Sequence, residues 1–388
     1  MIKKSNIAIV CPSCGGEGAV GNVAVHQARE LTRYFRVILL SDSFPKEVSE
    51  DVECCLLSPA RFDCLRRYCH VPNEFAFVVS AKKALEKINR QRRLTAVLCH
   101  GHAVAAFITK TLKEKYGSPT LMVIHGDIFE RPLGTYDPRV SWFYRRVTPR
   151  AYQSVSMVIV LAPHMKDFAV RGGADPNIVQ VIPNGLDPNE IGLSESTSGW
   201  TPPEKGEQIR LLYVGRLSVE KGADVLLEAC TALLEQEINF HLDIIGTGPE
   251  LDNYQKFVMG KELESSVTFS GPLPRRNLGA IYRSAHLVCV PSRDDSLPTV
   301  VIESLLAGVP VVGTKVGGIP FLLAEGKRGY LVDRGNPLEL AKMIVDCRGD
   351  IDTLSKFSSL GQQFVSQQLS WRKNGRSIYS AVNSILDQ

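Results

Sequence analysis

Residues 291–320 read PSRDDSLPTVVIESLLAGVPVVGTKVGGIP, and they are the most informative part of the chain. An apolar run at 287–290 comes directly before it and predicts a buried strand. A polar loop then leads into an apolar helix that carries Glu303, and a second buried strand follows at 309–312. Strands that alternate with helices in this way indicate a parallel sheet covered on both faces. Asp295 comes near the predicted helix N-terminus, where unpaired backbone N–H groups can bind phosphate or hydroxyl oxygens.

The same alternation extends along the whole chain of 388 residues, a length that favours two domains. Further buried strands are predicted at 7–11, 37–40, 96–99, 121–124, 157–161, 179–182, 210–214, 241–245 and 267–269. Between residues 191 and 208 the sequence turns polar and contains Pro202 and Pro203, which indicates a linker. We therefore expect two doubly wound, Rossmann-like α/β domains, 1–190 and 209–370, that face each other across a ligand-binding cleft.

Composition is that of a water-soluble globular protein, with 44% hydrophobic and 22% charged residues. No apolar run approaches the ~20 residues that span a bilayer, and no signal-peptide h-region follows the basic start, so a cytoplasmic location is expected. Residues 1–193 hold 25 Lys and Arg against 18 Asp and Glu, and the remainder holds 20 against 23.

Basic residues cluster at Arg61–Arg67, Arg90–Arg93 and Arg145–Arg150. One interpretation is that the first domain lies on an anionic membrane, at its inner face, or binds an acidic acceptor. The other is solvated surface charge, and the sequence leaves both open. Nucleic acid is not an expected partner, because aromatic residues are not interleaved with the basic ones.

Two cations flank a short loop after the strand at 210–214. Gly215 opens this loop, and Arg216 and Lys221 stand at its opposite ends, where both can converge on one anion. A diphosphate leaving group requires such cations, because negative charge builds up on it as its bond to carbon breaks. A solvated strand-to-helix loop is the alternative. After the next strand, Gly246 and Gly248 allow the backbone to approach a ligand closely.

Several other cofactor sites are disfavoured. Residues 15–21, GGEGAVG, lack the G-x-G-x-x-G spacing of a dinucleotide site, and no acidic residue ends the second strand. No G-x-x-x-x-G-K-[ST] phosphate loop is present. Cys11 and Cys14 form a single C-x-x-C without a second pair, so no metal site is predicted.

Three histidines end strands of the first domain. His125, in the sequence His125-Gly-Asp127, can hydrogen-bond a sugar hydroxyl or move a proton. His100 and His102 are weaker candidates for the acceptor side. Asp350 and Asp352 form a separated Asp pair that resembles a metal-diphosphate motif, and we interpret them as helix-capping surface residues.

Taken together, these motifs resemble the retaining family-4 glycosyltransferases of the GT-B fold, also called glycosyl transferases group 1. The resemblance covers nearly the whole chain, and the motifs occur in the family's order. They are the N-terminal glycine loop, His125, VIPNGLD at 181–187, the Arg216/Lys221 loop, GTGP at 246–249, VTFSG at 267–271, residues 291–320 and GYLV at 329–332.

The resemblance implies a role for each candidate residue. Arg216 and Lys221 hold the donor diphosphate, and with His125 and Asp295 they form the expected catalytic set. The expected donor-binding residues are Gly15 and Gly16 over the phosphates, Gly215, Gly246 and Gly248 in the loops, Pro272 and Leu273 beside the base, Ser296, Leu297, Pro298, Thr299 and Val300 at the sugar and phosphate, and Glu303 at the ribose. The family's C-terminal helix crosses back to the first domain, which predicts that residues 371–388 do the same.

The first domain is then the acceptor side and the second the donor side. The implied reaction retains the anomeric configuration and needs no metal or cofactor beyond the nucleoside diphosphate sugar, with a UDP-sugar favoured and a GDP-sugar as the alternative. A glycan, glycolipid or small molecule is the expected acceptor, in the synthesis of a cell-surface polysaccharide or another glycoconjugate. Asp295 and Pro298 depart from the family's usual Glu and Gly, and we interpret both as variation in donor-sugar specificity.

Three other functions compete. A nucleotide-sugar epimerase of the same fold would need no acceptor, and a catalytically silent subunit would bind the donor without transfer. A glycosidase that uses Asp295 and Glu303 is disfavoured, because hydrolysis of a glycosidic bond by water does not require a phosphate-binding loop.

Overall fold

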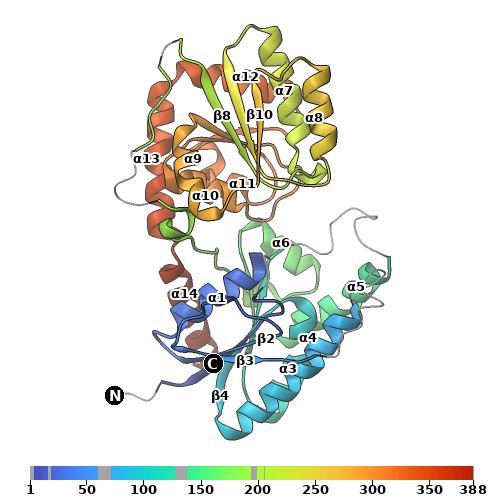
Figure 1. Ribbon diagram of the computed structural model, residues 1–388. Coiled ribbons are helices and arrows are strands. Elements are labelled where there is room, and N and C mark those ends of the chain that lie inside the picture. Colours follow the sequence, from blue (N-terminus) through green and yellow to red (C-terminus); the bar gives the residue numbers. More distant parts are fainter. Residues whose placement is uncertain are drawn as a thin grey trace. The chain divides into compact units, whose positions relative to one another are not determined.

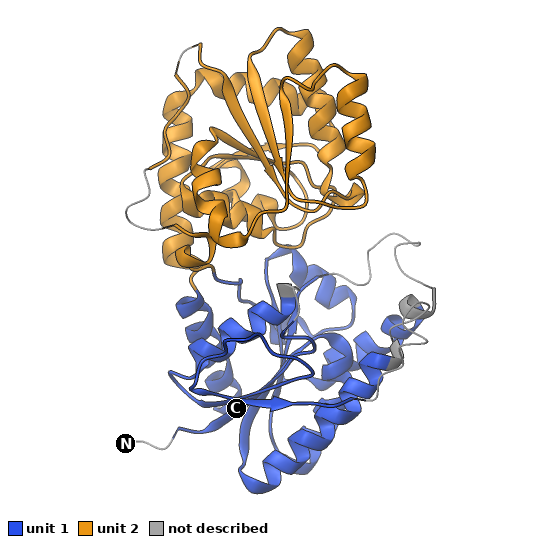
Figure 2. Ribbon diagram, viewed as in Figure 1, with its two compact units in different colours: residues 1–185, 371–388 blue, residues 186–370 orange. Residues whose placement is uncertain are grey.

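The computed structural model describes residues 4–15, 19–59, 71–126, 138–193, 199–204 and 206–387. The chain divides into two compact units, residues 1–185 with 371–388 (unit 1) and residues 186–370 (unit 2), as Figure 2 shows. Each unit contains one parallel sheet with helices on its faces (Figure 1), which confirms the predicted pair of Rossmann-like α/β domains.

The division falls earlier than the sequence predicts. It lies between Gly185 and Leu186, so the described part of 191–208 belongs to unit 2 and is not a linker between the units. Leu186, Ile191 and Leu193 explain this position, because all three are buried in the hydrophobic core of unit 2. The segment looks like a linker only because its few apolar residues are too widely spaced to form a helix or strand pattern.

Unit 1 is built on a seven-stranded parallel sheet in the order β3-β2-β1-β4-β5-β6-β7. The strands are β1 (Asn6–Val10), β2 (Arg36–Ser41), β3 (Val52–Leu56), β4 (Leu94–His100), β5 (Thr120–Ile124), β6 (Met157–Val160) and β7 (Val179–Val181). Central strands such as β1 are apolar and buried along almost their whole length, as strands covered on both faces must be. The edge strand β3 exposes Glu53 and Cys54, and for that reason the apolar pattern does not predict it.

Helices cover both faces of this sheet. They are α1 (Ala19–Leu31), α3 (Val71–Gln91), α4 (His102–Tyr116), α5 (Pro138–Ser154), α6 (His164–Arg171) and the C-terminal α14 (Trp371–Leu386). The step from β1 to β2 and the step from β4 to β5 run in opposite directions, so right-handed crossovers place α1 and α4 on opposite faces. α4 packs against α3 and α5, and α1 packs against α14.

The C-terminal helix belongs to unit 1, as the sequence predicts. Trp371 stacks on His26 of α1 with ring centroids 4.4 Å apart, and Tyr379 stacks on Tyr34 at 4.3 Å. Gly375 faces Glu30 so closely that an added Cβ would lie 2.6 Å from the Glu30 Cβ. A stripe of buried residues along α14, including Ile378, completes the packing.

Unit 2 is built on a six-stranded parallel sheet in the order β10-β9-β8-β11-β12-β13. The strands are β8 (Ile209–Val214), β9 (Phe240–Ile245), β10 (Val267–Gly271), β11 (Leu287–Val290), β12 (Val311–Thr314) and β13 (Tyr330–Val332). The helices are α7 (Ala223–Glu235), α8 (Leu251–Gly260), α9 (Leu278–Ser284), α10 (Thr299–Ala307), α11 (Ile319–Leu322), α12 (Pro337–Gly349) and α13 (Ile351–Gln368).

The two faces of this sheet form two hydrophobic layers. Successive residues of one strand point to opposite faces, so Leu211 joins the layer with α7, α8 and α12, while Leu212 joins the layer with α9, α10, α11 and α13. Asp350 caps α13 by accepting a hydrogen bond from the Thr353 amide at 3.2 Å, which agrees with its predicted capping role. None of the helices in the described ranges is long and apolar enough to cross a membrane.

Candidate active site

The strand order of unit 2 places the predicted motifs at one edge of its sheet. β9 and β10 lie on one side of β8, whereas β11, β12 and β13 lie on the other. The strand order therefore reverses between β8 and β11. Open α/β sheets bind ligands at the carboxyl ends of the strands, at such a reversal point. The loops that leave these two strands are 215–222 and 291–298, the two segments that the sequence selects.

Glycines allow these loops to approach their neighbours. Gly222 has a φ of 69°, and a Cβ on it would lie 2.1 Å from the carbonyl oxygen of Pro291. Gly317 has a φ of 53°, and its Cβ would lie 1.8 Å from the carbonyl oxygen of Asp295. A side chain at either position would thus push the site apart, which is a physical reason for glycine at both.

An ion pair joins two of the predicted catalytic residues. The Nζ of Lys221 lies 2.6 Å from Oδ2 of Asp295, and both side chains are partly buried. The sequence did not predict this contact, because 74 residues separate the two positions. An ammonium group has three N–H donors, so one bond to Asp295 leaves two for another anion.

Arg216 is exposed at the start of the same loop, and its backbone carbonyl accepts a hydrogen bond from the Tyr213 hydroxyl at 2.9 Å. The charge of Arg216 affects the pKa of Glu220. Burial alone would raise the pKa of Glu220, but a backbone hydrogen bond and the charges of Arg216 and Lys221 lower it below its ordinary value. The loop therefore carries two cations at one end of the sheet, as predicted.

Arg293 fixes the two loops to each other, and the sequence analysis missed it. Its guanidinium donates to both carboxylate oxygens of Asp224, at 2.7 and 2.5 Å, and to the carbonyl of Val219 at 2.9 Å. Its backbone N–H also donates to the carbonyl of Glu220 at 2.8 Å. The hydrogen bonds to Asp224 raise the pKa of Arg293. The bidentate geometry gives this contact strength and direction.

The N-terminus of α10 is open to an anion. Pro298 occupies the N-cap position with a φ of −67°, no side chain caps the helix, and its first turn contains no acidic residue. The first amides of an α-helix have no partner within the helix, and the helix dipole favours negative charge there. Thr299 is exposed, and Ser296, Leu297 and Val300 are half-buried.

Glu303, the predicted ribose ligand, already has partners. Arg275 donates to its Oε1 from Nη2 at 2.7 Å and from Nε at 3.1 Å, and the hydroxyl of Tyr282 donates to its Oε2 at 2.8 Å. Arg275 also contacts Glu190 at 3.2 Å. Burial, with the nearby carboxylate of Glu303, raises the pKa of Tyr282. The carboxylate is thus held in one orientation by two residues that the sequence analysis missed.

Gly246 and Gly248 lie where the loop after β9 packs against the loop after β8. A Cβ on Gly246 would lie 1.9 Å from the carbonyl oxygen of Gly215, and one on Gly248 would lie 2.2 Å from that of Leu217. Pro272 is exposed at the end of β10, and Leu273 is half-buried against the core of unit 2.

Unit 1 brings the three predicted histidines to the carboxyl edge of its own sheet. His100 ends β4, His102 starts α4 and His125 follows β5. Nδ1 of His100 lies 2.8 Å from Nε2 of His125, and Nε2 of His102 lies 3.3 Å from the hydroxyl of Tyr152. Burial lowers the pKa of His102 and of His125 to about 4, so both rings are neutral at neutral pH.

The glycine loop of unit 1 is only partly described. The amide of Gly15 donates to the carbonyl of Ser43 at 3.1 Å, and a Cβ there would lie 2.5 Å from the carbonyl oxygen of Phe44. Gly16, Asp127 and the cluster Arg61–Arg67 lie outside the described residues. Of the predicted phosphate contacts from this loop, Gly15 is therefore the one that can be placed.

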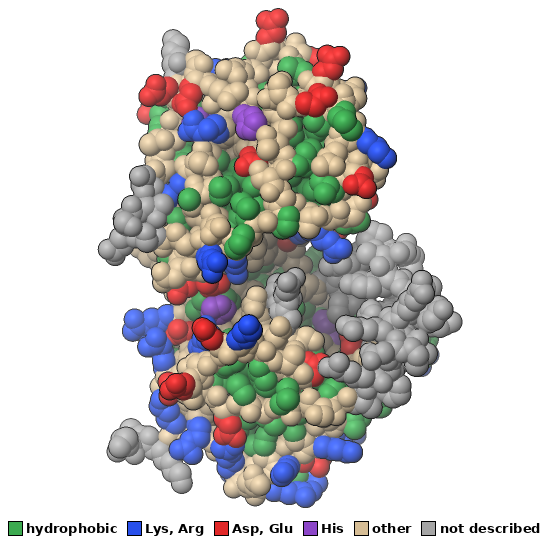
Figure 3. Space-filling view, viewed as in Figure 1, with side chains coloured by type: hydrophobic (Ala, Val, Ile, Leu, Met, Phe, Trp, Pro, Cys, Tyr) green, Lys and Arg blue, Asp and Glu red, His purple; other side chains and the backbone are tan. Residues whose placement is uncertain are grey.

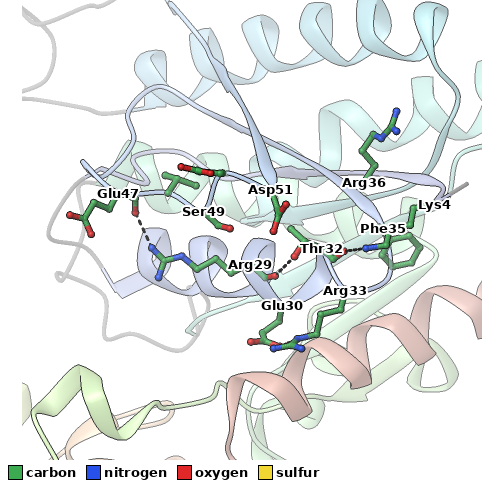
Figure 4. Close-up of a pocket in the computed structure, with 12 residues that line it drawn as sticks. Lys4, Arg29, Glu30, Thr32, Arg33, Phe35, Arg36, Glu47, Ser49 and Asp51 are labelled. Carbon is green, nitrogen blue, oxygen red and sulfur yellow. Dashed lines mark hydrogen bonds and ion pairs between the residues drawn. The ribbon is translucent and has the colours of Figure 1, made fainter. Parts of the chain in front are cut away.

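A hollow of about 1430 Å³ lies at the opposite edge of unit 1, near the amino ends of β1 and β2 (Figure 4). Some of its charged side chains bond to nearby groups: Lys4 donates to the carbonyl of Thr32 at 2.6 Å, and Arg33 pairs with Glu30 at 2.8 Å. We assign it no ligand, because open α/β sheets bind ligands at the other ends of their strands. In the part of the chain that is described, no three His, Cys, Asp or Glu side chains are grouped to hold a metal ion.

Comparison with known families agrees with this geometry. The family model described as Glycosyltransferase Family 4 matches residues 20–190, and the one described as Glycosyl transferases group 1 matches residues 198–358. The chain belongs to the family-4 glycosyltransferases of the GT-B fold. The two matches together cover most of the chain and meet close to the division between the two units.

Curated relatives match more locally. A D-inositol 3-phosphate glycosyltransferase from Corynebacterium glutamicum is 29% identical over 236 residues, which is 57% of this chain and 55% of the relative. A putative colanic acid biosynthesis glycosyltransferase, WcaL, from Salmonella typhimurium is 28% identical over 187 residues, 46% of each chain. This chain therefore spans about half the length of the curated relatives it matches.

Solved structures share the fold over nearly the whole chain. Sucrose-phosphate synthase from Thermosynechococcus elongatus gives a TM-score of 0.78 at 17% identity and covers 99% of this family-4 chain and 100% of its own. Anabaena HepE, solved with UDP, gives 0.74 at 18% identity, covering 98% and 100%. At these identities the likeness shows the fold alone.

Because His102 is buried and neutral, we expect unit 1 to lose stability in acid. The pKa of His102 is about 4 in the folded chain and about 6.5 when unfolded. Between these two pH values the unfolded chain binds more protons at His102 than the folded chain does. The stability that depends on a neutral His102 is therefore complete above pH ~6.5 and is lost as the pH falls toward ~4. His102→Gln removes this titration. Between pH about 7.5 and about 4.5, the free energy of unfolding of unit 1 should therefore fall by about 2 kcal/mol less in the variant than in the wild type.

Urea titration followed by hydrogen exchange of β4 and β5 measures this difference for unit 1 by itself. Replacement of His241, a half-buried histidine on β9 of unit 2, serves as the control and should leave the pH dependence of unit 1 unchanged. Equal pH dependence in the wild type and His102→Gln would show that His102 titrates normally.

Proposed function

We propose that this chain is a retaining glycosyltransferase that moves a hexose-type sugar from a nucleoside diphosphate sugar to an acceptor hydroxyl. The observation that carries the proposal is the meeting of Lys221, Asp295 and the open N-terminus of α10 at the carboxyl edge of the unit 2 sheet. Cations and free helix amides at one edge suit a diphosphate. The names of the family and of the relatives support transfer rather than another use of the nucleotide sugar.

Lys221 and Arg216 are assigned to the diphosphate. Negative charge grows on its terminal phosphate oxygen as the bond to the sugar breaks, and preorganised N–H donors stabilise that charge without rearrangement. Asp295 holds Lys221 in place through the 2.6 Å ion pair. We therefore interpret Asp295 as a residue that orients the lysine, in addition to any contact with the donor sugar.

The reaction then needs no protein nucleophile. The bond between the anomeric carbon and the phosphate oxygen breaks, and the acceptor oxygen bonds to that carbon on the same face. The proton of the acceptor hydroxyl passes to the departing phosphate oxygen. Because Arg216, Lys221 and the α10 amides supply the positive charge, we propose that no metal ion takes part.

Two further residues, Glu303 and His125, are assigned to the donor. Glu303 is held by Arg275 and Tyr282, and Oε2 keeps one lone pair for a ribose hydroxyl. His125 of unit 1 is assigned to the transferred sugar. Anabaena HepE has been solved with UDP and with UDP-glucose, which supports a UDP-sugar as the donor here.

The central test is substitution of Lys221. Lys221→Ala removes the ammonium and its ion pair with Asp295, so turnover should fall by roughly 10²- to 10³-fold. Release of UDP from UDP-sugars in the presence of a panel of acceptors is the assay. Lys342→Ala is the matched control, since Lys342 is 76% exposed on α12 and pairs with Asp346. Turnover of Lys221→Ala within about twofold of the control would remove the assigned role.

The stereochemistry of the product separates this proposal from its competitors. Proton NMR of the first-formed glycoside should show the anomeric configuration of the donor, and the donor incubated alone should keep its sugar unchanged. An altered sugar without acceptor would identify an epimerase. Tight donor binding with no transfer to any acceptor would identify a silent binding subunit.

For the acceptor side we propose peripheral contact with an anionic membrane through α5. Arg145, Arg146 and Arg150 are exposed there, and the guanidinium of Arg146 lies 4.8 Å from the ring of Trp142, which is 60% exposed. Basic and aromatic side chains together suit a lipid headgroup layer. On the part of unit 1 that is visible in Figure 3, basic and acidic side chains are interspersed.

Sedimentation with vesicles tests this contact. The chain should bind vesicles rich in anionic lipid at low salt and less at moderate salt, and a variant with Arg145 and Arg146 changed to Glu should bind several-fold less. A variant with Lys110 and Lys113 of α4 changed to Glu carries the same charge change as a control. Equal binding of the two variants, or none by the wild type, would exclude α5 as the contact.

A further inference from the structure

His100 and His125 form a pair at the carboxyl edge of the unit 1 sheet. His100 is the last residue of β4, and His125 directly follows the neighbouring strand β5. Nδ1 of His100 lies 2.8 Å from Nε2 of His125, and the ring centroids are 5.0 Å apart. His100 is 1% exposed, whereas His125 is only half-buried. His125 can therefore reach a ligand, and His100 lies behind it.

We propose that His100 is a positioning residue that holds His125 in the tautomer with its proton on Nδ1, so that His125 donates a hydrogen bond to the transferred sugar. This inference rests on the proposed function for the contact with the sugar. The tautomer itself follows from the pair alone.

A contact of 2.8 Å between two ring nitrogens requires one proton between them. Both rings are neutral at neutral pH, because burial, and to a smaller extent the charge of the other ring, lowers the pKa of His100, and burial lowers that of His125 to about 4. Two arrangements then remain. Either His100 donates from Nδ1 to His125, or His125 donates from Nε2 to His100.

The second nitrogen of His100 decides between them. Its Nε2 is buried and, among the residues that the structure describes, has no hydrogen-bond partner. If His125 were the donor, His100 would carry its proton on Nε2, as a buried N–H without an acceptor. Such groups are rarer in proteins than unfilled acceptors. His100 therefore carries its proton on Nδ1 and donates it to Nε2 of His125.

This choice fixes the chemistry of His125. Its Nε2 is the acceptor from His100, so its own proton lies on Nδ1, the nitrogen that remains for a ligand. A sugar in retaining transfer gains positive charge at the anomeric carbon as the donor bond breaks. A neutral imidazole can hydrogen-bond such a sugar without repelling it, whereas an imidazolium could not.

Nitrogen-15 NMR of the full chain with labelled histidine tests the tautomer directly. In the wild type, Nδ1 of His125 should show the shift of a protonated ring nitrogen and Nε2 that of a bare one. Two nearly isosteric variants divide the role of His100. His100→Asn keeps an N–H donor near the Nδ1 position and should preserve the pattern. His100→Leu has no donor, and the proton of His125 should then move to Nε2 or divide between both nitrogens.

Activity follows the tautomer. His100→Leu should lower kcat about tenfold to hundredfold with a smaller change in the KM for the donor, and His100→Asn should recover most of the loss. His102→Gln is the control for the spectrum, because His102 contacts Tyr152 and should leave the tautomer of His125 unchanged.

A proton on Nε2 of His125 in the wild type, or an unchanged tautomer in His100→Leu, would overturn the proposal. So would a tautomer change without any effect on a measurable transferase activity. If the predicted tautomer is found but no nucleotide sugar is bound or used, the proposed function fails and the inference about the tautomer stands.

Discussion

The ion pair between Lys221 and Asp295 is the contact on which the rest of the unit 2 site depends. It joins the loop that leaves β8 to the loop that leaves β11, at the point where the strand order of the sheet reverses. Close packing of three loops makes it possible, since Gly222 lies against the backbone of Pro291, and Gly317, in the loop after β12, lies against that of Asp295. Lys221 therefore lies at the same carboxyl edge of the sheet as the N-terminus of α10.

The two units present different chemistry at the carboxyl edges of their sheets. In unit 2 the edge carries the cations Arg216 and Lys221 and a helix N-terminus, all suited to a diphosphate. In unit 1 it carries imidazoles that burial keeps neutral, suited to sugar hydroxyls. Such a division fits the proposed reaction, in which negative charge grows on the leaving group while positive charge grows on the sugar.

Local sequence patterns were enough to predict most of the strands and the loops that follow them. Buried parallel strands are apolar along their length, and both loops of the unit 2 site begin where such a run stops. The edge strand β3 escaped because half of it is solvated, and α5 escaped because it is polar and contains Pro149. The boundary between the units was misplaced because Leu186, Ile191 and Leu193 become buried only in the folded core.

The partners of the site residues could not be predicted for a different reason. Arg293 with Asp224, Arg275 with Glu303 and His100 with His125 are pairs separated by 69, 28 and 25 residues. No periodic pattern connects such positions, and only the strand order brings them together. Arg275 holds Glu303, which the sequence did select, and Arg293 joins the two loops that carry Lys221 and Asp295. Sequence reasoning thus selected the charged and imidazole groups expected at the site, including both histidines, and missed Arg275 and Arg293, which hold the site together.

The most direct test of the account is a crystal structure of the chain with a bound nucleoside diphosphate. We expect the terminal phosphate to lie within about 3 Å of Nζ of Lys221 and of the first amides of α10, with Arg216 turned toward it. A nucleotide bound elsewhere, such as in the hollow of unit 1, or a phosphate that Lys221 does not contact, would contradict it.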